Sequence, residues 1–167
     1  MGIKIGLLSL LGFLYPTYYF YKEGLIPYNS VLNRKQTEPY NYYILAIQKW
    51  CQKEYQIHGL WPQYTVNTWP ENCNAPKYEN VYGDLLKDMD ENWANCDMSN
   101  QDFWNHEYTK HLSCIYEQYG LTESESFTMT IQLFKELTDS DFEKCNGNTD
   151  CYVACYDLYL NKINCPT

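Results

Sequence analysis

The sequence contains three histidines, and all of them lie in two short segments. His58 stands in the first segment, Gln-Ile-His-Gly-Leu-Trp-Pro, and the second segment runs His106-Glu107-Tyr-Thr-Lys110-His111. A helix turns by about 100° per residue, so residues 106, 110, 107 and 111 would lie at about 0°, 40°, 100° and 140° around it. Two imidazoles, an ammonium and a carboxyl would then share one face of that helix.

These side chains suit acid–base chemistry at a phosphate. An imidazole titrates near physiological pH and can give or take a proton. An ammonium and a carboxyl can bind and balance the charge of a pentacoordinate phosphorus centre. His58, delivered from a separate strand, would supply the second member of an acid–base pair.

Two other interpretations of these segments stay open. The His-Glu-x-x-Lys-His stretch can be a solvated helix face with internal ion pairs, which are common at spacings of three and four. The other interpretation is a metal site formed by His58, His106 and His111 together. The metalloprotease pattern of zinc ligands is not present, because it needs histidines four residues apart and the residue four after His106 is Lys110.

Apolar and aromatic patterns predict the elements that position these segments. The pattern predicts strands over Tyr42–Trp50, Tyr55–Trp61 and Cys151–Leu160, and helices over about Asp84–Trp93, Asp102–Tyr119 and Phe127–Leu137. We expect Pro62 to end the second strand. We expect Ser99 or Asn100 to cap the histidine-bearing helix and Gly120 to terminate it.

Composition limits the class of protein. A chain of 167 residues with 45% hydrophobic and 17% aromatic residues can form one compact domain, but not two large ones. The charged fraction of 20% and the 18 tyrosines exclude a disordered or coiled-coil chain. The formal charge of -9 repels polyanions, so a nucleic-acid partner would have to be held at a local site.

The N-terminal region is apolar. An uncharged run from Ile5 to Tyr15 follows Lys4 and has the length of a signal-peptide core. We therefore predict a signal peptide or an uncleaved membrane anchor over residues 1–21, a polar linker over 22–39 and a folded domain over 40–167. The alternative is that the run is an N-terminal helix or strand of the fold.

Eight cysteines, an even number, suggest up to four disulfides and an oxidising compartment. A metal cluster is the weaker interpretation. The only close spacings are Cys145-x5-Cys151 and Cys151-x3-Cys155, and no histidine lies nearby to complete a zinc site.

At its two histidine segments the chain resembles the ribonuclease T2 family of secreted and endolysosomal endoribonucleases. The first family motif, His-Gly-Leu-Trp-Pro, stands unaltered at residues 58–62. The second, His-Glu-Trp-x-Lys-His-Gly-Thr-Cys, is present at residues 106–114 with Tyr108 for Trp, Leu112 for Gly and Ser113 for Thr. The resemblance covers about Tyr42 to Cys114, and the regions before the first motif and after the second are shorter than is usual in the family.

The resemblance implies an α+β fold, an antiparallel sheet with helices packed mainly on one side. It implies cleavage of single-stranded RNA without metal or cofactor, through a 2′,3′-cyclic phosphate to a 3′-phosphate, with DNA inert. His111 would be the general base and His58 the general acid, His106 would bind the phosphate, and Glu107 and Lys110 would stabilise the pentacoordinate state. A bell-shaped pH profile is expected from the histidine pair.

Base recognition would involve Trp61 and Trp69, which match family positions that stack a base. Trp61 can instead be a core residue, because aromatic side chains at strand ends bury well. Gln63 stands where many relatives have Asp or Asn, so a base preference cannot be inherited from them.

The resemblance also favours disulfide pairs: Cys73 with Cys114, Cys155 with Cys165 and Cys51 with Cys96. Cys145 and Cys151 remain as a fourth pair. We expect a monomer that is either secreted or located in the endolysosomal lumen. An uncleaved N-terminal segment would instead tether it to a membrane. The alternative function is that of a catalytically weak, secreted or membrane-tethered binding protein that keeps the fold.

Overall fold

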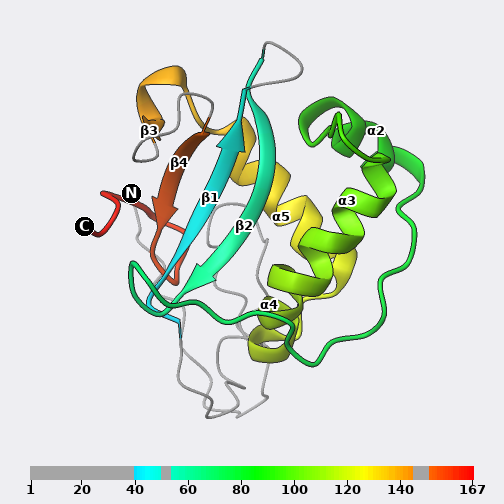
Figure 1. Cartoon of the computed structure of the whole chain (residues 1–167), viewed down its shortest axis with the longest axis horizontal. Helices are drawn as coiled ribbons and strands as arrows, with labels where there is room; N and C mark the ends of the chain where they lie inside the picture. The colour runs from blue at the N-terminus through cyan, green and yellow to red at the C-terminus, as the bar shows by residue number, and fades with distance from the viewer. Residues whose placement is uncertain (1–39, 50–53, 145–150) are drawn as a thin grey trace, which may run out of the picture.

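An antiparallel sheet forms one layer of the molecule (Figure 1). The computed structural model describes residues 40–49, 54–144 and 151–167, so the predicted segments 1–21 and 22–39 lie outside the described residues. Four strands are ordered β2-β1-β4-β3, and β5 also pairs with β4. The strands are β1 (Tyr42–Gln48), β2 (Gln56–Gln63), β3 (Glu143–Lys144), β4 (Cys151–Tyr156) and β5 (Lys162–Ile163).

The helices form the second layer, gathered to one side of the strands. They are α2 (Gly83–Asn92), α3 (Asn100–Glu107), the π-helical segment η1 (Tyr108–Leu112), α4 (Ser113–Tyr119), α5 (Glu123–Lys135) and the short 3-10 helix η2 (Asp139–Asp141). Helix α5 packs on β1 and β2, while α3 and η1 contact β2 at the edge of the sheet. The predicted α+β class is confirmed.

The core lies between these two layers. Leu45, Ile57 and Leu60 of the sheet are fully buried, as are Trp93 and Phe127 from the helical side. Burying one such side chain stabilises the folded state by about 1.5–3 kcal/mol relative to leaving the side chain exposed. None of the helices among the described residues has the length and apolarity needed to span a membrane.

Local signals place the helix ends. The Ser99 hydroxyl accepts a hydrogen bond from the Asp102 backbone amide at 3.2 Å, so Ser99 is the cap of α3. Gly120 ends α4 in the left-handed conformation, with φ of 72°, as expected.

Several predicted boundaries are wrong, and β1 ends at Gln48 rather than at Trp50. β2 continues through Pro62 to Gln63, because it is an edge strand in the described sheet and a missing amide can face away from β1. Helix α5 begins at Glu123, four residues before the prediction, because Thr122 and Glu125 form a capping box. The last predicted strand ends at Tyr156 and is followed by a turn and β5.

Candidate active site

A β-bulge sets the direction of His58. Ala46 lies opposite Gly59 and Ile47 opposite Ile57, so His58 is an extra residue on β2 in this ladder. A regular strand would place residues three apart on opposite faces, whereas a bulge re-aims one side chain. His58 and Trp61 consequently line the same cavity.

The second histidine segment spans a change of helix type. His106 and Glu107 end α3, and Lys110 and His111 lie in the π-helical segment η1, so the predicted single helix over 102–119 is interrupted. The Lys110 carbonyl accepts a hydrogen bond from the Asn72 amide at 2.8 Å, a partner outside the helix. Such π segments are frequent at functional sites, where they re-aim the following side chains.

The two segments meet in one cavity of about 350 Å³. It is lined by Ile44, His58, Trp61, Gln63, Val66, Trp69, His106, Glu107, Lys110 and His111. All eight residues that sequence reasoning assigned to catalysis, phosphate binding or base binding are therefore brought together.

The Glu107 carboxylate lies at the centre of the polar contacts. Its Oε2 accepts a hydrogen bond from Trp61 Nε1 at 2.9 Å. Its Oε1 lies 3.5 Å from His58 Nε2 and 4.0 Å from His106 Nε2. Glu107 is only 1% exposed, whereas the side chains of His58 and His106 are 40% and 56% exposed, so a buried carboxyl group faces two imidazoles that solvent can reach.

Burial distinguishes His111 from the other two imidazoles. His111 is 6% exposed and its Nδ1 has no hydrogen-bond partner in the structure. Desolvation by burial lowers its pKa to about 4, with the positive charge of Lys110 acting in the same direction and Glu107 opposing it. His111 is consequently neutral over most of the acidic and neutral range and able to accept a proton.

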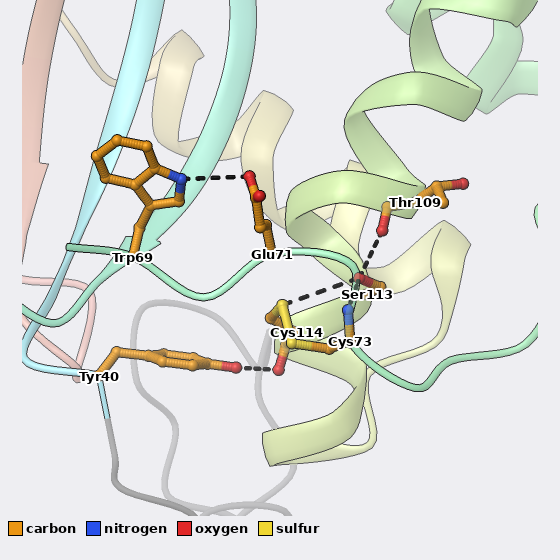
Figure 2. Close-up of a disulfide and its surroundings, with 7 residues drawn as sticks. All are labelled: Tyr40, Trp69, Glu71, Cys73, Thr109, Ser113 and Cys114. Carbon is orange, nitrogen blue, oxygen red and sulfur yellow. Dashed lines mark hydrogen bonds between the residues drawn. A yellow bond between two sulfur atoms is a disulfide. The ribbon is translucent and has the colours of Figure 1, made fainter.

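The loop between β2 and α2 contributes Val66 and Trp69 to the lining of the cavity. Figure 2 shows Trp69, Glu71 and Cys73 along this loop, beside Ser113 and Cys114 of α4. Glu71 Oε2 accepts a hydrogen bond from Trp69 Nε1 at 3.4 Å and lies 3.9 Å from Lys110 Nζ. The Cys73–Cys114 disulfide anchors this loop to α4, and the Cys73 amide donates to the Ser113 hydroxyl at 3.1 Å. Glu71 thus joins the predicted base platform, Trp69, to Lys110, which is predicted to stabilise the pentacoordinate state, and no motif or periodicity in the sequence signals this role.

The other disulfides follow the resemblance as far as they are described. Cys155 is bonded to Cys165, and Cys96 and Cys151 are each disulfide-bonded. Cys51 and Cys145 lie outside the described residues, so their pairings with Cys96 and Cys151 stay predictions.

The alternative of a three-histidine metal site can be compared with the geometry. Within residues 40–49, 54–144 and 151–167, no group of three or more His, Cys, Asp or Glu side chains is arranged to hold a metal ion. The imidazoles of His58 and His106 instead face the Glu107 carboxylate, and His111 packs against the Trp61 ring.

The fold and the site define a disulfide-containing α+β protein in which two histidine segments, one on a bulged edge strand and one on an interrupted helix, meet in a polar cavity. The sequence profile of the ribonuclease T2 family matches residues 19–150, and the chain belongs to this family.

Known proteins agree with that assignment. The chain is 30% identical over 103 residues to intracellular ribonuclease LX of Solanum lycopersicum, covering 58% of this chain and 44% of the relative. It is 35% identical over 92 residues to ribonuclease DdI of Dictyostelium discoideum, covering 54% and 41%. The matched regions thus span less than half of these curated relatives.

A solved structure shares the fold. The self-incompatibility-associated SF11-RNase of Nicotiana alata superposes with a TM-score of 0.61 at 19% identity, covering 76% of this chain and 92% of the other.

Proposed function

We propose that the protein is an endoribonuclease that cleaves single-stranded RNA by transesterification. The observation that carries this proposal is the convergence of His58, His106, Glu107, Lys110 and His111 on one cavity. Membership of the ribonuclease T2 family and similarity to proteins named as ribonucleases support the same reaction class.

The buried, neutral His111 suits the general base. It would take the proton of a ribose 2′-hydroxyl while that oxygen bonds to the adjacent phosphorus. The bond from phosphorus to the 5′-oxygen would break, and protonated His58 would give that oxygen a proton. Water would then open the 2′,3′-cyclic phosphate to a 3′-phosphate with the two imidazoles in exchanged roles.

The remaining groups would stabilise charge. Lys110 and His106 would bind the phosphate oxygens, and Glu107 would balance the charge of the imidazoles that face it. No metal or cofactor enters this scheme, and DNA would be inert because it lacks the 2′-hydroxyl.

Trp69 is the side chain best placed to bind a base. It lines the cavity and is 48% exposed, and stacking of a base on such a ring contributes about 1–3 kcal/mol. Gln63 lines the same cavity but is only 4% exposed, and its amide donates to the Trp61 carbonyl at 3.5 Å. We therefore place base stacking on Trp69 and give Gln63 no direct part in reading a base edge.

An oxidising compartment fits the disulfides. The relatives include an extracellular and an intracellular ribonuclease, and disulfides persist in secreted and lumenal proteins. We propose a secreted or endolysosomal location for this chain.

The test is cleavage of single-stranded RNA by the oxidised protein over about pH 4–8, with EDTA present and matched DNA as a control. We expect chelator-resistant cleavage that leaves cyclic-phosphate ends and intact DNA. His58→Ala and His111→Ala should each lower kcat by orders of magnitude. Asp84→Ala, on the exposed face of α2, should retain the wild-type rate.

Other outcomes contradict this proposal in different ways. Folded protein that binds RNA but leaves it intact would favour the binding-protein alternative. Activity that is lost on addition of EDTA would favour a metal site built from the histidines.

A further inference from the structure

We propose that Trp61 is a positioning residue that holds the Glu107 carboxylate and the two reacting imidazoles in register, rather than a platform for a base. This inference rests on the proposed function. It concerns how the site is assembled, and it changes the role that the family resemblance gives to this tryptophan.

The indole N–H of Trp61 is hydrogen-bonded to Glu107. Trp61 Nε1 donates to Oε2 of this carboxylate at 2.9 Å. Oε1 is then left facing the Nε2 atoms of His58 and His106, at 3.5 and 4.0 Å. The bond from Trp61 therefore fixes the rotation of the carboxyl group about its terminal torsion, which is otherwise broad for a glutamate.

The indole ring of Trp61 packs against the imidazoles of His58 and His111. The His111 ring packs on it at 5.3 Å with an angle of 35°, and the His58 ring meets it at 5.2 Å with an angle of 75°. A base that stacked on the side occupied by His111 would displace the proposed general base. Trp69 has no such neighbour among the described ring contacts and is 48% exposed, so it can take a base without rearrangement.

The backbone beneath this contact leaves room for it. A Cβ atom at Gly59 would overlap Glu107 Oε2 and would lie 2.5 Å from Trp61 Nε1. The described glycines with positive φ are Gly83 and Gly120, so Gly59 is needed for space and not for an unusual conformation. The strand is thus shaped to let the carboxylate and the indole meet.

The first variant to measure is Trp61→Phe, which keeps a ring between the histidines but removes the N–H. Loss of a charge-assisted hydrogen bond should lower kcat about 10- to 100-fold, with KM changed less than about twofold. Gly59→Ala tests the same contact without truncating the indole, because its methyl group presses on Glu107. We expect the same kcat loss from it.

A double-mutant cycle with Glu107→Ala, which removes the oxygen that accepts the Trp61 N–H, separates positioning from general damage. If Trp61 acts through the carboxylate, Trp61→Phe should change kcat by less than about twofold in the Glu107→Ala background. Trp69→Phe is the matched control, since it removes an indole N–H from the same cavity but not from Glu107. Its effect should fall on KM and should persist in the Glu107→Ala background.

The outcomes are distinguishable from failure of the proposed function. Wild-type protein that leaves RNA intact refutes the ribonuclease assignment itself. With an active wild type, an unchanged kcat in Trp61→Phe, a loss that appears in KM or base preference, or a loss that is additive with Glu107→Ala would each overturn the positioning role. Thermal unfolding of all variants identifies any that have lost the fold.

Discussion

The environment of each imidazole determines the proton transfer that it can perform. The side chain of His58 is 40% exposed and its Nε2 faces the Glu107 carboxylate, whereas His111 is buried. A neutral base and a charged acid are needed at the same pH. Burial lowers the pKa of His111 to about 4, so this imidazole is in the neutral form above that pH. This asymmetry supports the assignment of His111 as base.

The lowered pKa of His111 predicts the acid limb of the pH profile. We expect kcat/KM to fall as the pH decreases through about 4, because protonated His111 cannot accept the 2′-hydroxyl proton. Lys110→Gln removes a positive charge that lowers this pKa, so its residual activity should show an acid limb at higher pH. The measurement is kcat/KM of both proteins against pH on one short RNA. An acid limb near pH 6.5 in the wild type would mean that His111 is solvated in the active enzyme.

At the scale of the elements, periodic features were predictable and pairing-dependent ones were not. The main strands and helices follow from apolar spacing, and Ser99 and Gly120 mark helix ends by their own chemistry. The bulge at His58 depends on which residues of β1 lie opposite β2. At the interruption η1, the Lys110 carbonyl accepts a hydrogen bond from the Asn72 amide in a distant loop. Nothing in the local sequence indicates the strand pairing or this hydrogen bond.

The same distinction applies to the site. Both histidine segments were identifiable because they combine rare residue types at short spacing, and the cavity brings them together. Glu71 was missed because it lies in a loop whose position depends on the Cys73–Cys114 bond. The contact of Trp61 with Glu107 joins two elements 46 residues apart, which no spacing rule reports.

The Cys73–Cys114 disulfide joins the base-binding loop to the catalytic helix. The two cysteines are 41 residues apart, so the chain-entropy relation gives a loss of about 4 kcal/mol in the free energy of unfolding for Cys73→Ser/Cys114→Ser. We also expect a raised KM, because Trp69 and Glu71 lie in the released loop. Urea unfolding and steady-state kinetics measure the two effects.

The matched control is Cys155→Ser/Cys165→Ser at the other disulfide. Its cysteines are 10 residues apart and link β4 to the C-terminal segment, and neither of them lines the cavity. The same relation gives a loss of about 3 kcal/mol with KM unchanged. Equal effects on KM from both pairs would mean that the first disulfide serves stability alone.

At the scale of the whole molecule, the charge of the chain opposes its proposed substrate. The net charge is -9, and the ammonium that lines the cavity is that of Lys110. RNA would therefore be held by stacking on Trp69 and by a few local contacts, not by a basic surface.

This charge distribution predicts weak salt dependence of RNA binding. Each phosphate contact on a single strand contributes about -0.7 to the slope of log K against log salt, so one or two contacts give a slope between about -0.7 and -1.4. Screening of the repulsion between RNA and the acidic surface flattens the slope further. The measurement is the Kd for a 2′-O-methyl RNA, which offers no free 2′-hydroxyl for attack, over a range of salt concentrations. Lys110→Gln removes one such contact and should make the slope less negative by about 0.7. A slope steeper than about -3 would show that RNA contacts several cations outside the cavity and would refute the local mode of binding.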